Sequence, residues 1–177
     1  LERFVNETRA KGGIPVLFNS VARRCFYQAP VENDDDEKLR KTTFAGEEKI
    51  NSNTLIDTHG AYVVAPRNVA RRLNVSFVDA TKITHDIETE LGIEGSRKLH
   101  MWFRPGECPQ IPKGRQDNTH YNVYGARLVA NALADEIGKQ VPELKKHVRH
   151  YDYVVSTRGR GNYFTLQDAV DAVPAGK

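Results

Sequence analysis

Two short apolar runs constrain the fold of this chain more than any other feature of its sequence. They are IPVLFNS, residues 14–20, and VSFVDA, residues 75–80, and each follows a segment with helical spacing. The side chains that share one helical face are Leu1, Phe4, Val5 and Thr8 before the first run, and Val69, Ala70 and Leu73 before the second. Continuous apolar runs of this length are typical of strands covered on both faces. Since a helix that leads into a buried strand is the unit of a parallel sheet, the sequence predicts an α/β fold.

Further helical patterns follow the second run. Thr81 is placed to cap a helix that Gly92 ends, and a second helix ends before Pro142. The predicted buried faces are Ile83, Ile87 and Leu91 in the first, and Ala126, Val129, Ala130, Leu133 and Ile137 in the second. Between them, KLHMWF at 98–103 predicts a short strand, before a loop rich in Pro and Gly.

The polar segment at residues 21–60 interrupts this rhythm. It carries the acidic run Asp34 to Glu37 and is long for a connection inside a compact domain. We expect either disorder or a functional surface insertion there. The acidic run itself is most simply a solvated surface loop.

Composition excludes several classes of function. The formal net charge is only +3, from 26 basic and 23 acidic residues, and no basic stripe with interleaved aromatic residues is present. We therefore expect no nucleic-acid partner. No apolar run approaches the roughly 18 residues needed to span a bilayer, so we expect no membrane partner. The two cysteines, Cys25 and Cys108, are compatible with either a disulfide in an oxidising compartment or two buried thiols.

The stretch DNTHYNVYGA, residues 117–126, is the strongest candidate for chemistry. It places Asp117 three residues before His120, just ahead of a helix that opens near a Gly-Ala pair. In a serine hydrolase the histidine moves the proton of the attacking hydroxyl, and the aspartate orients the ring. A spacing of three lets both partners meet within one turn. The spacing alone is weak, but sites gather in loops at the strand ends of open α/β sheets.

Several segments in order resemble the SGNH-type (GDSL-like) carbohydrate esterases, specifically the rhamnogalacturonan acetylesterase group. They are RFVNETRAKGGIPVLFNSVARRCF, DTHGAYVVAPRNVARRLNVSFVDAT and FRPGECPQIPKGRQDNTHYNVYGARLVANALADEI. The resemblance covers about residues 1–145. It implies a flavodoxin-like three-layer sandwich with a parallel sheet, His120 as the base, Asp117 as its orienting partner, and release of acetate from an acetylated pectic polysaccharide without a cofactor.

The family's nucleophilic serine has no counterpart in this sequence. The five serines are Ser20, Ser52, Ser76, Ser96 and Ser156, and none lies in a GDS or G-x-S-x-G setting. The oxyanion-hole Gly and Asn of the family are absent as well. We therefore expect residues 1–145 to be the C-terminal part of an esterase domain, without a nucleophile and inactive alone, with the missing N-terminal part as a possible partner.

The end of the chain shows a second resemblance. YVVSTRGRGNYFTLQDAVDAVPAGK, residues 153–177, is similar to the opening of pectin methylesterase (pectinesterase) domains, with Arg158 where those domains carry Asp. The resemblance implies a short stub of a β-helix domain after a linker at 146–152. From the residues themselves we expect a strand at 151–156 and a helix at 166–173, while the catalytic carboxylates of that family would lie beyond the segment.

Other residues carry weaker signals. Trp102 is a candidate for stacking on a sugar, although packing is the commoner role of a lone Trp. Arg23 and Arg24 could meet a uronate carboxylate, but we favour solvated turn residues. The spacing of His59, His85 and His100 does not predict a metal site.

Two other functions stay open. The chain could be the accessory domain of a pectin methylesterase, or a non-catalytic pectin-binding module. In each case the implied location is secreted or periplasmic.

Overall fold

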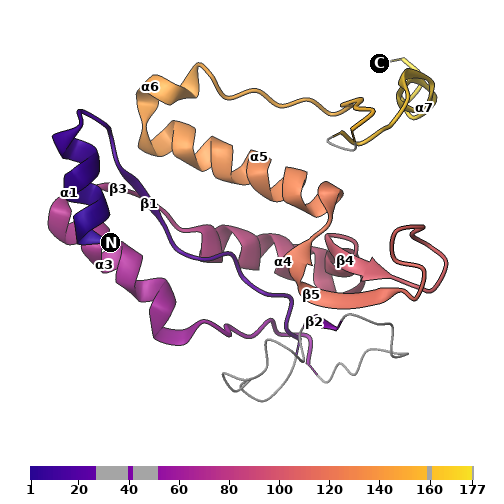
Figure 1. Cartoon of the computed structure of the whole chain (residues 1–177), viewed down its shortest axis with the longest axis horizontal. Coiled ribbons are helices and arrows are strands. Elements are labelled where there is room, and N and C mark those ends of the chain that lie inside the picture. Colours follow the sequence, from indigo (N-terminus) through magenta and orange to yellow (C-terminus); the bar gives the residue numbers. More distant parts are fainter. Residues whose placement is uncertain (27–39, 42–51, 159–160, 177) are drawn as a thin grey trace.

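The computed structural model describes residues 1–26, 40–41, 52–158 and 161–176, and Figure 1 shows their arrangement. The acidic run Asp34 to Glu37, predicted as a solvated surface loop, lies outside the described residues. None of the described helices is long and apolar enough to cross a membrane. The fold mixes helices with two small sheets, one parallel and one antiparallel.

The parallel sheet forms as the sequence predicts. Strand β1 (Val16–Phe18) pairs in parallel with β3 (Ser76–Val78), with Val16 opposite Ser76. Helix α1 (Glu2–Ala10) leads into β1, and the 3-10 turn η2 (Gly60–Val63) and helix α3 (Val64–Leu73) lead into β3. This confirms the α/β prediction at the level of one parallel pair.

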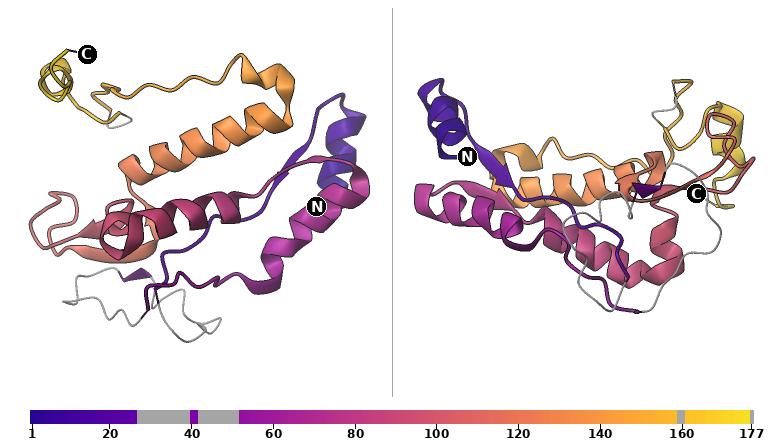
Figure 2. Two further views of the ribbon diagram at one scale, coloured as in Figure 1. Left: turned by 180° about the vertical axis from the view of Figure 1, so that it is seen from behind. Right: turned by 60° about the horizontal axis from the view of Figure 1, so that its bottom comes forward.

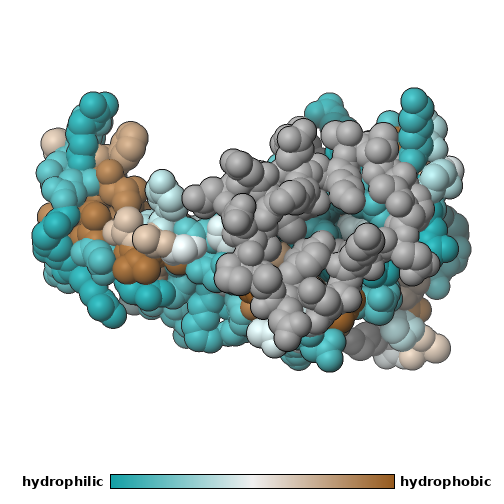
Figure 3. Space-filling view, turned by 90° about the horizontal axis from the view of Figure 1, so that it is seen from below, coloured by the Kyte–Doolittle hydropathy of each residue, from teal (hydrophilic) through white to brown (hydrophobic). Residues whose placement is uncertain are grey.

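The first two helices are tied together at their ends. Helix α3 stops at Asn74, which adopts the left-handed conformation with φ of 48°. Arg9 of α1 donates to the carbonyl oxygens of Leu73 and Asn74 at 2.9 and 3.0 Å, and so satisfies acceptors that a helix end leaves open. Of the predicted inner face of α1, Val5 is buried but Leu1 and Phe4 are exposed. Figure 3 shows apolar side chains gathered at the end of the molecule formed by α1 and α3.

Helix α4 (Ala80–Arg97) differs from the prediction in its N-cap residue and in the face that it buries. Asp79, rather than Thr81, is the N-cap, and its side chain accepts from the Lys82 N–H. Gly92 breaks the helix with φ of 65°, as expected, but a further helical turn follows it. The buried side chains are Ala80, Thr84, Glu88 and Ser96, whereas Leu91 of the predicted face is exposed. The polar buried face is possible because Thr84 and Glu88 have partners from other elements.

Asn19 joins the end of β1 to the start of α4. Its Nδ2 donates to Asp79 Oδ1 at 2.7 Å, and its Oδ1 accepts from the Thr81 N–H at 2.9 Å. Arg67 of α3 also forms an ion pair with Asp79. Burial by itself would raise the pKa of Asp79, but the hydrogen bonds from Asn19 and the Lys82 N–H, together with Arg67, lower it below its ordinary value.

The second sheet is antiparallel and holds the motif. Strand β5 (Arg115–Tyr121) pairs with β4 (His100–Phe103) on one side and with β2 (Arg40–Lys41) on the other. The prediction of a strand at 98–103 is therefore confirmed. The sequence placed Asp117 and His120 in a loop, whereas the structure places them in β5.

Helix α5 (Val123–Gln140) follows β5 directly and packs over α4 (Figures 1 and 2). Asn122 caps it by accepting from the Gly125 N–H at 2.9 Å. Gly125 sits against the backbone of Leu99, where an added Cβ would lie 2.1 Å from the carbonyl oxygen. Pro142 ends α5 as predicted and opens the short helix α6 (Pro142–Lys145).

The C-terminal segment runs back beside α5. Helix α7 (Leu166–Asp171) agrees with the helical pattern at 166–173. The predicted strand at 151–156 is wrong, because only a single bridge forms there, between Val155 and Tyr163. The segment has no long neighbouring strand to pair with, so the residues described here form no β-helix coil.

Candidate active site

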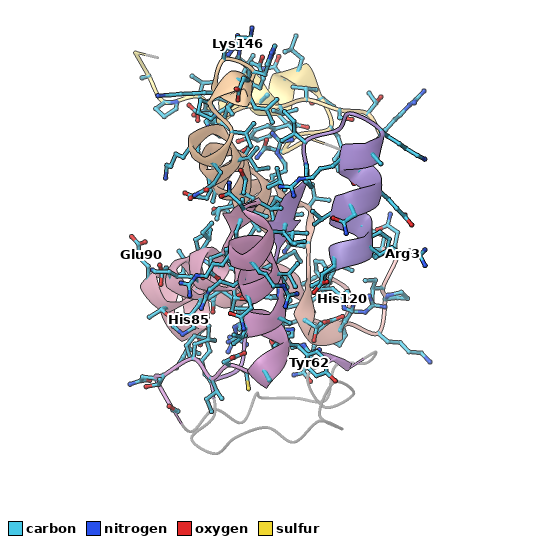
Figure 4. The ribbon with its side chains drawn as sticks, turned by 90° about the vertical axis from the view of Figure 1, so that its left-hand side faces the viewer. Arg3, Tyr62, His85, Glu90, His120 and Lys146 are labelled. Carbon is cyan, nitrogen blue, oxygen red and sulfur yellow. The ribbon has the colours of Figure 1, made fainter. Side chains whose placement is uncertain are left out.

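Asp117 and His120 meet as the motif predicts. Asp117 Oδ2 lies 2.9 Å from His120 Nδ1. The aspartate side chain is only 2% exposed, while the imidazole is 55% exposed. A buried carboxylate therefore fixes one ring nitrogen, and Nε2 is the nitrogen left to exchange protons with a ligand. Figure 4 shows His120 away from His85 and Glu90 of α4.

A turn inside β5 creates this geometry. Met101 lies opposite Asp117 and His100 lies opposite Tyr121, so three residues of β5 are looped out of the ladder between those positions. Asp117 Oδ1 accepts from the N–H groups of both Thr119 and His120 at 2.9 Å. The same carboxylate thus closes the turn with one oxygen and orients the imidazole with the other.

Asn118 anchors the looped-out residues to the rest of the molecule. Its Oδ1 accepts from Arg24 NH1 at 2.8 Å and from Trp102 Nε1 at 3.1 Å. The backbone of Arg24 also donates to the Asn118 carbonyl oxygen at 3.0 Å. The turn that carries the candidate base is therefore held from behind by two side chains distant in sequence.

The structure corrects the expectation for Arg24. This side chain is 0% exposed, so it is neither a solvated turn residue nor available to a uronate. Its Nε donates to Ser96 Oγ at 3.0 Å and its NH2 to the Ile93 carbonyl oxygen at 2.8 Å. Arg23, by contrast, is half-buried and contacts Thr58 at 3.4 Å.

Trp102 lies on the other face of the strand pair from Asp117. It pairs with Gln116, the neighbour of Asp117, and successive side chains of a strand point to opposite faces. Arg97 lies over its ring at 4.8 Å. Trp102 also lines a surface pocket of about 210 Å³, together with Glu94, Arg97, Lys98, Arg104 and Glu107.

The remaining histidines do not assemble into a metal centre in the described part of the chain. His59 lies near Asp57, at 3.8 Å, and His85 near Asp86, at 3.9 Å. His100 is buried against Glu88 with an Nε2–Oε1 distance of 3.0 Å. Cys25 and Cys108 are not bonded to each other.

No serine, threonine or cysteine side chain is hydrogen-bonded to His120 among the residues the structure describes. Ser52, Ser76 and Ser96 are each bonded to nearby carbonyl oxygens, and Ser156 accepts from the Arg158 N–H. In the described residues, the pair of Asp117 and His120 therefore has no serine, threonine or cysteine side chain in contact with the imidazole.

Sequence reasoning missed the residues that support the pair. Asn118 lies inside the motif, but nothing in the sequence marks its partners Arg24 and Trp102. Glu88 was missed because helical periodicity placed Ile83 and Ile87 on the buried face. Gly125 had a visible signal, since a glycine in the first turn of a helix often marks a close backbone approach.

One known protein is similar to most of the chain. Rhamnogalacturonan acetylesterase RhgT of Bacillus subtilis (strain 168) is 31% identical over 148 residues. The match covers 84% of this chain and 54% of that protein, so the chain spans about half the length of the relative. No family model matches the chain, and no solved structure matches it.

Proposed function

We propose that this chain carries the acid–base half of a carbohydrate esterase site of the SGNH/GDSL type, which removes O-acetyl groups from rhamnogalacturonan. The observation that carries the proposal is the pairing of a buried Asp117 carboxylate with an exposed His120 imidazole at 2.9 Å. The similarity to a rhamnogalacturonan acetylesterase supports both the reaction and the substrate class.

His120 would act in both steps of the reaction. In the first step, Nε2 takes the proton of an attacking serine hydroxyl, whose oxygen bonds to the acetyl carbon. The bond from that carbon to the sugar oxygen breaks, and the imidazolium returns the proton to the sugar oxygen. In the second step, His120 takes a proton from a water molecule whose oxygen bonds to the acetyl carbon. The bond from that carbon to the serine oxygen then breaks, the imidazolium returns the proton to the serine oxygen, and acetate leaves. Asp117 stabilises the imidazolium that forms in each step.

The proposed nucleophile lies outside residues 1–177. Its absence from the surroundings of His120 in the described residues supports this, as does the match to only about half of the relative. Residues 1–145 would then be the C-terminal part of a flavodoxin-like three-layer domain, completed by the portion that holds the serine and the oxyanion hole.

The polysaccharide and the location belong to the same proposal. Trp102 would contact a sugar with its ring, in the pocket that it lines, because its indole N–H already donates to Asn118. Residues 153–177 would open a pectinesterase-type domain, on the strength of their sequence alone. A pectic substrate implies a secreted or periplasmic protein.

The proposal is tested by measuring acetate release from O-acetylated rhamnogalacturonan with two proteins. The first is the 177-residue chain, with His120→Ala as control. The second is a chimera that joins this chain to the portion of the Bacillus subtilis relative outside the matched residues. We expect no release above the control from the chain alone, and release by the chimera that His120→Ala abolishes.

Three outcomes would contradict the proposal in different ways. Release by the chain alone that depends on His120 would place the nucleophile within residues 1–177. A folded chimera that releases no acetate, while a protein extended beyond residue 177 releases methanol from methyl-esterified pectin, would favour a pectin methylesterase. A chimera that binds the polysaccharide equally with and without His120 and releases nothing would favour a binding module.

A further inference from the structure

A buried ionisable pair lies behind the candidate site and has no part in the proposed reaction. The side chains of Glu88 in α4 and His100 in β4 are 1% and 0% exposed, and Oε1 and Nε2 lie 3.0 Å apart. Removing two such groups from water is costly, and apolar residues of similar volume often stabilise a fold equally well. The pair therefore calls for an explanation other than stability.

Tyr121 connects this pair to the candidate base. Its hydroxyl donates to the same Glu88 oxygen at 3.2 Å, and its ring lies 4.7 Å from the ring of His100. Tyr121 directly follows His120 and is the residue at which β5 rejoins the ladder, opposite His100. Glu88 and His100 thus both contact Tyr121, the residue at which the turn that carries His120 ends.

The Tyr121 hydroxyl stays protonated at ordinary pH. Burial raises the pKa of Tyr121 far above its usual range, and the neighbouring Glu88 carboxylate raises it further. The hydroxyl therefore remains a hydrogen-bond donor to Glu88 in the folded protein.

We propose that Glu88 and His100 are positioning residues for His120, which act through the hydroxyl and ring of Tyr121. The turn then has two anchors: Asn118 at its start, held by Arg24 and Trp102, and Tyr121 at its end. Between them His120 is exposed, so its position depends on these anchors. A displacement of about 1 Å in a catalytic group can cost on the order of a hundredfold in rate.

The decisive variant is Tyr121→Phe, which removes a single hydroxyl, and the matched control is Tyr124→Phe. Tyr124 is three residues along the chain, in α5, and is 54% exposed. The first readout is hydrogen exchange of the Thr119 and His120 amides in the 177-residue chain, because both amides donate to Asp117. Since one hydrogen bond is worth about 1 kcal/mol, we expect roughly fivefold less protection in Tyr121→Phe and no change in Tyr124→Phe.

The second readout separates positioning from general stability. The ¹⁵N resonances of the His120 ring report which nitrogen carries the proton, and a ring held by Asp117 shows the Nδ1–H form. We expect Tyr121→Phe to move these resonances toward the averaged pattern of a ring that exchanges between tautomers. Glu88→Gln, which keeps an acceptor oxygen, should retain the wild-type pattern better than Glu88→Leu.

Some outcomes would overturn the inference. Unchanged Thr119 and His120 amides in Tyr121→Phe would show that the buried pair does not hold the turn. An equal loss of protection at every amide would mean that the buried pair and Tyr121 contribute only to global stability. The role of His120 as a base rests on the proposed function, but amide exchange and ring resonances need no activity, so a failed acetate assay leaves this test intact. In an active chimera, Tyr121→Phe should lower kcat and leave KM unchanged.

Discussion

At the scale of single residues, the Asp117 carboxylate performs two tasks that most sites divide. One oxygen closes the turn by accepting two backbone N–H groups, and the other holds the imidazole. Asp117→Asn keeps the size of the side chain but removes its charge, so it no longer favours the tautomer with a proton on Nδ1. In an active chimera we expect kcat to fall by about three to four orders of magnitude, the loss typical of such a change in serine hydrolases. A loss below tenfold would argue against Asp117 as the orienting group.

The neighbouring arginines offer a second residue-scale test. Arg24→Met removes a buried guanidinium that donates to Asn118, Ser96 and Ile93. Each buried acceptor left without its donor costs about 1–3 kcal/mol, so we expect a large fall in the urea midpoint. Arg23→Met is the matched control at the half-buried adjacent position and should cost much less. Equal losses in the two variants would contradict the role of Arg24 as an anchor.

At the scale of elements, two glycines of α5 differ in how closely other residues approach them. Gly125 faces backbone atoms that leave no space for a Cβ, whereas Gly138 faces a side chain. A Cβ at Gly125 would meet the Leu99 carbonyl oxygen at 2.1 Å, whereas one at Gly138 would meet a Val148 methyl group at 3.1 Å. Gly125→Ala must push α5 away from Leu99, the residue before β4, so we expect a loss of about 1–3 kcal/mol, as overpacked sites show. Gly138→Ala should cost less, because a side chain can yield and alanine favours a helix. Thermal unfolding of the two variants gives the comparison.

The junction of β1 and α4 should show a distinct pH dependence. Because the folded-state pKa of Asp79 is lowered, its stabilisation is present above the unfolded pKa of about 3.9 and is lost as pH falls through the folded value. Asp79→Asn keeps a capping oxygen but loses the charge, which should cost about 1 kcal/mol at neutral pH. Urea titrations at several pH values measure the free energy of unfolding of both proteins. We expect the difference between wild type and Asp79→Asn to become smaller below about pH 4. A stability difference that does not change with pH would contradict the ionised Asp79 carboxylate as the source of this stabilisation.

The elements themselves were largely predictable, and the contacts between them were not. Periodicity located α1, β1, α3, β3 and α5, because each has a local signal that its tertiary setting does not override. It failed on the buried face of α4, where Glu88 takes a core position through a partner twelve residues away. It also failed at 151–156, since an apolar run forms a strand only if another strand is present to pair with it. The pair Asp117 and His120 was predictable because its geometry is local, whereas its anchors come from separate elements.

At the scale of the whole molecule, the segment after residue 150 contributes little to the core. Ala169 is the one buried hydrophobic residue described there, while Phe164, Leu166 and Val170 are exposed. A contact from His150 to Asp135 at 2.7 Å precedes the segment, and the Val155–Tyr163 bridge lies within it. Since burial of apolar area dominates folding stability, a chain truncated after His150 should keep nearly the full urea midpoint and the protection of the Thr119 and His120 amides. Loss of that protection would mean that the predicted boundary at 146–152 does not separate independent units, and that the candidate site depends on both.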